Sequence, residues 1–321
     1  MKKRNIILLS LVSVLLSFLI VAFFVIRQKI MPAPNHLVVS GKSDLLPITW
    51  LASDHSEKAV LLLPVKIKGI DLPFYMQFDT GASSTIFYKK TLSAIQAKFP
   101  DQIGVIDTAI NTIQQNLLLG NMTIHSDQFR LYDRGVSAIN WDDEGAIPVI
   151  GTLGADLIDQ RISIIDFKRD RCFFGIQIPE AYRHNLEMND FKYKMRKTMF
   201  PAIVAGRQCN LLHDTGTSGF ELITDEATWK ELAAKEASMR AAFEVQSWNQ
   251  KLLAYNIASD DTIYFQQSAI PLTKVTYIEG ASFMQHLLMR ATGMGGMIGN
   301  EVFEDKVLVI DCQNQQYGIL D

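Results

Sequence analysis

The sequence is poor in the residues that cross-link a protein or bind metals. Its three cysteines, Cys172, Cys209 and Cys312, are odd in number and lie far apart. This pattern excludes a disulfide framework and the paired ligand spacing of a zinc site, so we expect buried thiols. The six histidines include no His-x-x-x-His pair. We therefore predict neither a metal nor another cofactor.

The chain also lacks an excess of basic residues. Its net charge is −3, and no cluster of lysine and arginine follows the first few residues, so we expect no nucleic-acid partner. The glycines at 293, 295 and 296 fit neither nucleotide-binding glycine fingerprint. A length of 321 residues with 48% hydrophobic content is instead enough for two folded domains.

One long apolar run stands at the amino terminus. Ile6 to Ile26 contains no charged residue and follows Lys2-Lys3-Arg4, which predicts a transmembrane helix within residues 1–30. The charge pattern favours a cytoplasmic amino terminus and an extracytoplasmic domain, periplasmic in a bacterium; a cleavable signal peptide is the alternative. Residues 31–58 then form a linker or a first strand, and residues 27–58 are a candidate prosegment.

Two short stretches carry the chemistry, Phe78-Asp79-Thr80-Gly81-Ala82-Ser83 and His213-Asp214-Thr215-Gly216-Thr217-Ser218. Each is predicted to place an acidic side chain at the end of a strand, just before a glycine turn. One such tripeptide is weak evidence for a site. Two copies in matching surroundings are much stronger.

The surroundings of the first copy predict a hairpin. Ala59 to Lys68 and Leu72 to Phe78 are apolar runs joined by the turn residues Gly69-Ile70-Asp71. Alternation along the second run places the side chains at 74, 76 and 78 on one face. A returning strand over residues 84–88 and a helix over residues 89–98 are predicted to follow.

The second half of the chain repeats this order. Gly296 to Asp311 matches Gly151 to Asp166 without a gap, at a constant offset. Phe220 to Ile223 is the expected returning strand, and Thr224 or Asp225 is expected to cap a helix that extends to about residue 235. This duplication predicts an all-β fold of two lobes, residues 59–185 and 186–321, related by a pseudo-twofold axis with a cleft between them. The polar stretch 179–194 is expected to join the lobes without strands.

Two equivalent carboxylates at the lobe interface would have to share one proton, because two like charges at hydrogen-bonding distance cannot both ionise cheaply. The ionised group can act as general base on a water molecule while the protonated group polarises a carbonyl. Thr80 and Thr215 are expected to form hydrogen bonds between the two loops. This arrangement is suited to amide hydrolysis without a metal.

These motifs resemble those of the bilobal, pepsin-like aspartic proteases, from about residue 59 to 320. The resemblance pairs Asp79 with a hydrophobic-Gly loop at Leu153-Gly154, and Asp214 with a second one at Ile298-Gly299. Ala82 makes the first loop similar to that of retropepsins. The resemblance implies a peptide or protein substrate in the interlobe cleft, no required oligomer, and catalytic Asp79 and Asp214. Loop support is implied for Thr80, Gly81, Ser83, Thr215, Gly216 and Thr217.

The sequence departs from the pepsin pattern in two places. No tyrosine occurs between residues 89 and 130, so the flap expected near residues 103–120 is unconventional. His213 occupies a position that is usually apolar and is predicted to pack in the core. Two other functions stay open: an inactive bilobal protein that binds or senses peptides at the membrane, and a membrane-anchored assembly partner.

Overall fold

The structure is a computed structural model that describes residues 31–143, 145–237, 242–247, 250–280 and 293–321. Residues Asn35–Asp321 form one compact unit, which contains all the features that follow.

The predicted membrane localisation needs correction. No helix within the described ranges is long and apolar enough to cross a bilayer. This finding overturns the prediction of a single-pass membrane protein with a cytoplasmic amino terminus and an extracytoplasmic domain. That prediction was based on the hydropathy of residues 6–26 and on the basic residues before them, and both lie outside the described residues.

The first sheet has nine strands among the described residues, and β5 lies inside it. β5 pairs antiparallel with β4 and parallel with β10. Phe74, Met76 and Phe78 of β5 are all buried, which confirms the predicted alternation. The strands are β1 (Val38–Ser40), β3 (Thr49–Ser53), β4 (Ser56–Ile67), β5 (Phe74–Phe78), β6 (Ile86–Tyr88), β7 (Ile106–Asp107), β8 (Thr112–Leu119), β9 (Met122–Tyr132) and β10 (Val149–Leu153).

The third sheet repeats the centre of the first. β16 pairs antiparallel with β15 and parallel with β23, and β17 pairs antiparallel with β23, as β6 does with β10. The strands are β14 (Lys192–Lys194), β15 (Lys197–Val204), β16 (Arg207–His213), β17 (Leu222–Thr224), β18 (Phe243–Ser247), β19 (Gln250–Ala258), β20 (Thr262–Tyr264), β21 (Ala269–Pro271), β22 (Lys274–Glu279) and β23 (Met294–Ile298).

A second sheet, with six strands in the described part of the chain, joins the two halves. Its strands are β2 (Leu46–Pro47), β11 (Ile162–Asp166), β12 (Arg171–Gly175), β13 (Asn189–Asp190), β24 (Val307–Asp311) and β25 (Gln316–Leu320). β11 and β24 are antiparallel, and Ile164 pairs with Val309. These two residues are also aligned with each other when the second half of the sequence is matched with the first. The pseudo-twofold axis therefore passes between these two residues.

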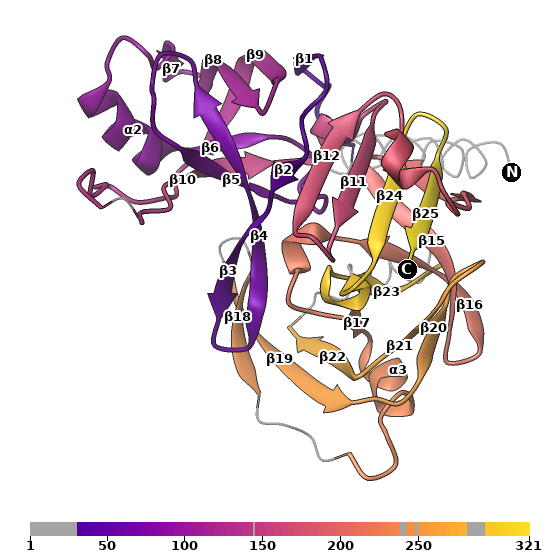
Figure 1. The fold of residues 1–321 in the computed structure, drawn as a ribbon. Helices are drawn as coiled ribbons and strands as arrows, with labels where there is room; N and C mark the ends of the chain where they lie inside the picture. Colours follow the sequence, from indigo (N-terminus) through magenta and orange to yellow (C-terminus); the bar gives the residue numbers. More distant parts are fainter. Residues whose placement is uncertain (1–30, 144, 238–241, 248–249, 281–292) are drawn as a thin grey trace, which may run out of the picture. The chain divides into compact units, whose positions relative to one another are not determined.

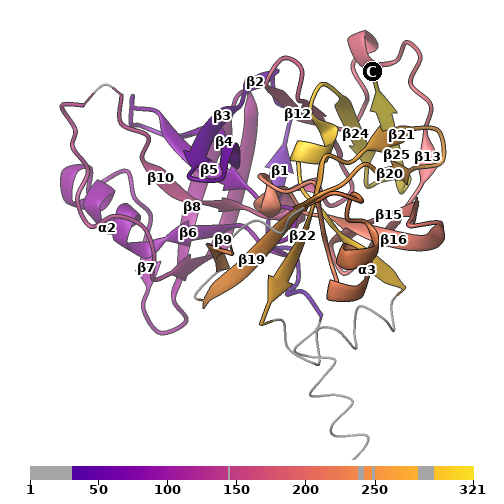
Figure 2. The ribbon, with the colours of Figure 1, turned by 90° about the horizontal axis from the view of Figure 1, so that it is seen from below.

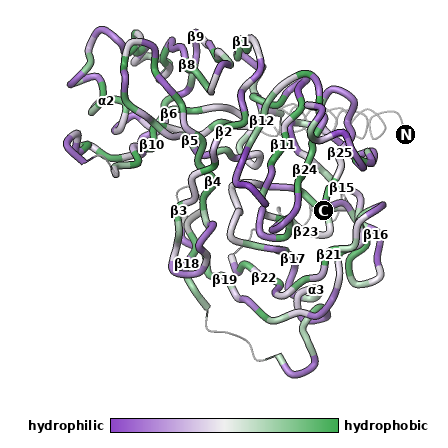
Figure 3. Tube along the Cα trace, in the orientation of Figure 1, coloured by the Kyte–Doolittle hydropathy of each residue, from purple (hydrophilic) through white to green (hydrophobic). Residues whose placement is uncertain are grey.

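In two orthogonal views, most of the first sheet and most of the third sheet occupy different halves of the molecule (Figures 1 and 2). Hydrophobic residues recur along the strands of both (Figure 3), and most buried apolar side chains form one continuous cluster. The fold is therefore all-β and bilobal, as predicted. The boundary at residue 185 stays a prediction.

The helices are short. α2 spans Lys89–Lys98, as predicted, and α3 spans Glu226–Glu231, shorter than predicted. Asp225 does cap α3, since its side chain accepts hydrogen bonds from the N–H groups of Ala227 and Thr228. The 3₁₀ helices are η1 (Ala155–Ile158), η2 (Glu180–Tyr182), η3 (Thr215–Thr217) and η4 (Glu301–Phe303).

The stretch 179–194 was wrongly expected to lack strands. It contains β13 and β14, which pair with β25 and β15. Their pairing depends on partners distant in sequence rather than on a local hydrophobic pattern, so the sequence carries little sign of them. Residues 38–53 likewise supply β1, β2 and β3, which pair with β9, β12 and β4.

Candidate active site

Each Asp-Thr-Gly loop leaves the inner strand of its sheet in the same way. The N–H of Asp79 donates to Leu153 O (3.0 Å), and the N–H of Asp214 donates to Ile298 O (2.9 Å). Leu153 and Ile298 are fully buried, so the two hydrophobic-Gly loops hold the aspartates from inside the protein. The repeat seen in the sequence is thus also a repeat of backbone geometry.

Thr80 and Thr215 connect the two loops by four hydrogen bonds. Thr80 Oγ1 donates to the carbonyl of His213 (3.0 Å) and accepts from the N–H of Thr215 (3.0 Å). Thr215 Oγ1 donates to the carbonyl of Phe78 (2.7 Å) and accepts from the N–H of Thr80 (2.9 Å). Both threonines have no exposed surface, so water does not compete for these bonds. These four bonds, called the Thr80–Thr215 interlock below, are the hydrogen bonds between the two loops that the sequence predicted.

The two glycines allow each loop to approach the opposite aspartate. A methyl group at Gly216 would lie 2.6 Å from Asp79 Oδ1, and one at Gly81 would overlap the Asp214 carboxylate more severely. Each carboxylate is also held by its own loop, because Ala82 N–H donates to Asp79 Oδ1 (2.9 Å) and Gly216 N–H donates to Asp214 Oδ1 (2.8 Å). The structure therefore brings Asp79 and Asp214 together.

Burial and mutual repulsion change the acidity of this pair. Burial raises the pKa of Asp79, the charge of Asp214 raises it further, and the result is about 7. The pKa of Asp214 is also raised by burial, while its bond from Gly216 N–H and the nearby Lys197 ammonium oppose the rise. Neither residue as a whole is fully buried. The pair can therefore hold one proton between its two carboxyl groups at mildly acidic to neutral pH.

Other predicted loop residues have supporting roles. Thr217 Oγ1 donates to Asp214 O (2.8 Å), and Ser83 contributes its carbonyl, which accepts from Arg196 Nη1 (2.9 Å). At Gly154 and Gly299 a side chain would collide with the backbone of Ser84 and of Thr217. All the residues predicted for the site therefore lie in or directly beside the two loops.

A buried acidic residue next to the first loop was missed by the sequence analysis. Asp156 in η1 accepts hydrogen bonds from Thr85 N–H (2.8 Å) and Thr85 Oγ1 (2.7 Å), just beyond the Asp-Thr-Gly turn. Burial raises the pKa of Asp156 to about 6, against the lowering effect of these bonds. The repeat contained a signal for it, since Asp156 aligns with Glu301, which pairs with Lys274 (2.7 Å).

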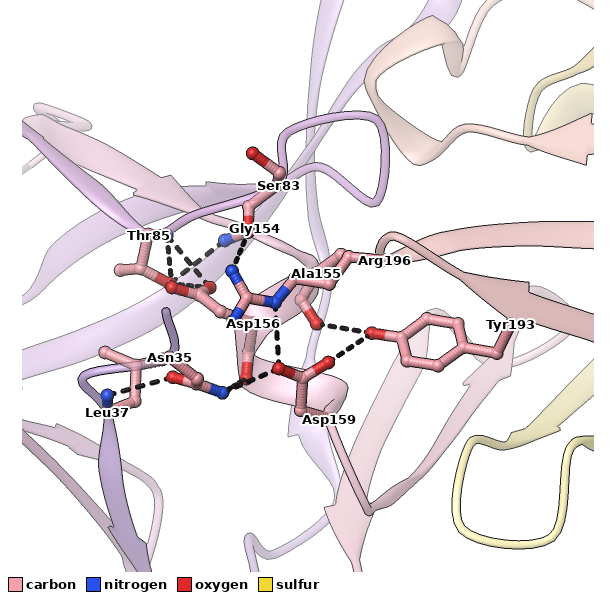
Figure 4. Close-up of polar contacts among 10 residues, drawn as sticks. All are labelled: Asn35, Leu37, Ser83, Thr85, Gly154, Ala155, Asp156, Asp159, Tyr193 and Arg196. Atoms are coloured by element: carbon pink, nitrogen blue, oxygen red, sulfur yellow. Dashed lines mark hydrogen bonds and ion pairs between the residues drawn. The ribbon is translucent and has the colours of Figure 1, made fainter. Parts of the chain in front are cut away.

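Four further residues extend this polar network, as Figure 4 shows. Arg196 Nε donates to Asp159 Oδ2 (2.8 Å), and the Tyr193 hydroxyl donates to Asp159 Oδ1 (2.7 Å). Asn35 Nδ2 donates to Asp159 Oδ2 (2.8 Å) and to the carbonyl of Asp156 (2.8 Å). The network joins the chain near residue 35 to the first loop. No local pattern in the sequence points to these contacts.

The region predicted to hold the flap, residues 103–120, contains β7 and β8. Val105 and Ile110 there are 81% and 60% exposed. Tyr88 from β6 lies closer to the pair: its hydroxyl shares a hydrogen bond with Thr152 Oγ1 (2.9 Å), and its pKa is raised by burial and, to a smaller degree, by the charge of Asp79. The flap assignment stays a prediction.

His213 lies in the core, as predicted. Its ring has no exposed surface, stacks on Phe200 with centroids 5.6 Å apart, and meets the Phe303 ring edge-on. Neither ring nitrogen has a hydrogen-bond partner within the described part of the chain. Burial lowers the pKa of His213 to about 4, and the Asn300 side chain opposes this shift. Asn300 Oδ1 also has no hydrogen-bond partner within the described residues.

His213 should therefore limit stability in acid. Its pKa is lower in the folded protein than the ordinary 6.5, so the unfolded chain binds the proton first and stability is lost as the pH falls from 6.5 towards 4. The expected loss is roughly 3 kcal/mol, measured by urea unfolding across this range. The variant His213→Phe, which copies Phe78 of the first lobe, should lose less stability over the same range.

Equal pH dependence in wild type and His213→Phe would contradict this explanation. If His213→Phe does not fold, the proton resonances of the His213 ring in the wild type give the same answer, since they should titrate well below the ordinary pKa.

Comparisons with known proteins find a likeness in structure but not in sequence. No protein-family model matches this sequence, and no curated protein is similar to it. A solved structure that it resembles is the crystal structure of the aspartic proteinase from Irpex lacteus, with 12% identity, a TM-score of 0.47, and coverage of 88% of this chain and 97% of that chain. The roles of Asp79 and Asp214 therefore rest on the geometry above, and the retropepsin-like character of the first loop stays a prediction.

Proposed function

We propose that this protein is an aspartic endopeptidase that hydrolyses peptide bonds with the Asp79–Asp214 pair. The observation that carries the proposal is the pair itself. Burial and the charge of Asp214 raise the pKa of Asp79, the two carboxyl groups come from equivalent loops, and the Thr80–Thr215 interlock fixes both loops. Such an arrangement is costly in an ordinary core, since buried charges of like sign repel each other.

The chemistry follows from the shared proton. The ionised carboxylate removes a proton from a bound water molecule as the water oxygen attacks the substrate carbonyl carbon, and the other carboxyl group donates its proton to the carbonyl oxygen. The tetrahedral intermediate then collapses: the C–N bond breaks, the amine takes a proton from the first carboxyl group, and one hydroxyl of the intermediate returns its proton to the second carboxylate. Water is consumed, one amine and one carboxylic acid form, and the pair again holds one proton.

The main alternative is a bilobal protein that binds peptides without cleaving them. It requires the fold but not two carboxyl groups that share a proton. The interlock and the two loop N–H groups orient both carboxylates, and this precision supports hydrolysis rather than binding alone.

The test is cleavage of a peptide library by the full-length protein from acidic to neutral pH, with the Asp79→Asn/Asp214→Asn double variant as the blank. New peptide termini should appear only with the wild type, and the rate should be highest where the pair holds one proton. Absence of cleavage over the whole pH range, or cleavage by the blank as well, would refute the proposal.

A further inference from the structure

The two aspartates are equivalent in backbone geometry but not in their surrounding charges. The turn between β14 and β15 contains Met195 and Arg196 in the left-handed region, with φ values of 54° and 57°. This turn directs two successive cations at the first catalytic loop. Arg196 Nη1 donates to the Ser83 carbonyl (2.9 Å), and Lys197 Nζ donates to the Gly81 carbonyl.

The first lobe has no counterpart of this lysine. Pro64 of β4 corresponds to Pro201 of β15 in the sequence repeat, and the same spacing aligns Lys197 with Val60. The position equivalent to Lys197 in the first lobe therefore carries no charge. The symmetry of the two loops is broken by a single residue that the resemblance to known proteases did not indicate.

The ammonium group of Lys197 lies on the side of Asp214. Gly81, whose carbonyl it binds, is packed so closely against Asp214 that a methyl group at Gly81 would overlap the carboxylate. Lys197 accordingly lowers the pKa of Asp214, in opposition to burial. For Asp79 the two largest influences, burial and the charge of Asp214, both raise the pKa.

Other titratable groups around the pair do not produce this asymmetry. The Tyr88 hydroxyl forms a hydrogen bond with Thr152 Oγ1, and because its pKa is raised it stays neutral at physiological pH. Arg196 forms an ion pair with Asp159 (2.8 Å), and Asp156 is held by Thr85 on the inner side of the loop. The His213 ring lies among Phe200 and Phe303.

We propose that Lys197 is a positioning residue that fixes the order of ionisation in the pair, so that Asp214 is the ionised carboxylate and Asp79 carries the proton. The catalytic meaning of this assignment rests on the proposed function: Asp214 becomes the base that activates water, and Asp79 becomes the acid that protonates the substrate carbonyl. Electrostatic attraction at this short range, in a partly buried site, is large enough to choose between two similar carboxyl groups.

The variant Lys197→Gln tests the charge separately from the hydrogen bond. Glutamine retains a donor for the Gly81 carbonyl but carries no charge, whereas Lys197→Arg retains the charge. Lys194→Gln, an exposed lysine on β14, is the matched control. Full-length protein labelled with ¹³C at the aspartate carboxyl groups is titrated by NMR, and the two resonances are assigned with Asp79→Asn and Asp214→Asn.

In the wild type and in Lys194→Gln, the Asp214 resonance should titrate at lower pH than that of Asp79. In Lys197→Gln, the Asp214 midpoint should rise by roughly one pH unit, and Lys197→Arg should restore it. Unchanged midpoints in Lys197→Gln, or a lower midpoint for Asp79 than for Asp214 in the wild type, would overturn the proposal. If Lys197→Gln does not fold, the order of the two wild-type midpoints still decides.

Kinetics gives a second readout. In Lys197→Gln the acid limb of the pH–rate profile should move to higher pH by the same amount, while a merely structural role would lower the rate equally at every pH. The NMR titration does not depend on turnover. A wild-type protein that cleaves no peptide would therefore refute the proposed function, whereas the titration would still decide the role of Lys197.

Discussion

Asp79→Asn is expected to lower the rate of peptide cleavage by roughly 10³-fold or more, because an amide can neither hold nor pass on the shared proton. The same substitution should make the protein more stable at neutral pH. Loss of activity together with a gain in stability is the sign of a group that is retained for function rather than for folding.

The direction of the stability change follows from the pKa of Asp79, which rises from 3.8 to about 7 on folding. The folded protein holds this proton more tightly than the unfolded chain, so stability falls as the pH rises from about 4 through 7. Asparagine removes this loss. Because Asp79 as a residue is not fully buried, we expect a gain on the order of 2 kcal/mol at neutral pH and little gain in acid.

Urea unfolding of Asp79→Asn at neutral and acidic pH measures the effect on stability, and a peptide-cleavage assay measures activity. The exposed Asp101 provides the control, since Asp101→Asn should change neither. An Asp79→Asn protein that is less stable than the wild type at neutral pH would show that the carboxyl pair contributes to folding and is not retained for function alone.

Gly81→Ala is expected to have the second largest effect. The added methyl group would overlap the Asp214 carboxylate, and the interlock on both sides leaves the loop little room to move. The loops would have to separate, which breaks buried hydrogen bonds worth about 1 kcal/mol each and displaces the two carboxyl groups. We expect a loss of stability of roughly 2–4 kcal/mol and a loss of cleavage of at least about 10²-fold.

Gly145→Ala is the matched control, because Gly145 is exposed and a methyl group there meets only a side-chain oxygen of Asp143, at 3.3 Å. Thermal unfolding measures the stability of both variants, and a peptide-cleavage assay measures their activity. Only Gly81→Ala should lose stability and activity. Wild-type activity in Gly81→Ala would mean that the two loops are not held in the close contact seen in the structure.

Much of the fold was predictable because it depends on local patterns that occur twice. The alternation at Phe74, Met76 and Phe78, the helix Lys89–Lys98, and the ungapped match of residues 151–166 with 296–311 all reappear in the structure. The repeat mattered most, since it turned one weak tripeptide motif into a symmetric pair. Features that occur in only one lobe were harder to predict. An example is α3, which ends at Glu231 rather than at about residue 235.

The supporting residues of the site were harder to predict because their partners are distant in sequence. Arg196 contacts Ser83 and Asp159, which lie 113 and 37 positions away. Lys197 reaches Gly81 over 116 positions. No periodicity or spacing encodes such contacts, which arise only when the β14–β15 turn meets the first loop. Asp156 is the exception, since its alignment with Glu301 could have identified it.

The most direct test of the shared-proton pair compares the cleavage rate of one peptide by the wild type, Asp79→Asn, Asp214→Asn and the double variant. Groups that act as one unit show strongly non-additive losses. We predict that each single variant loses about as much activity as the double variant, roughly 10³-fold or more. Losses that multiply in the double variant, or substantial activity in either single variant, would contradict the claim that Asp79 and Asp214 act together on one water molecule.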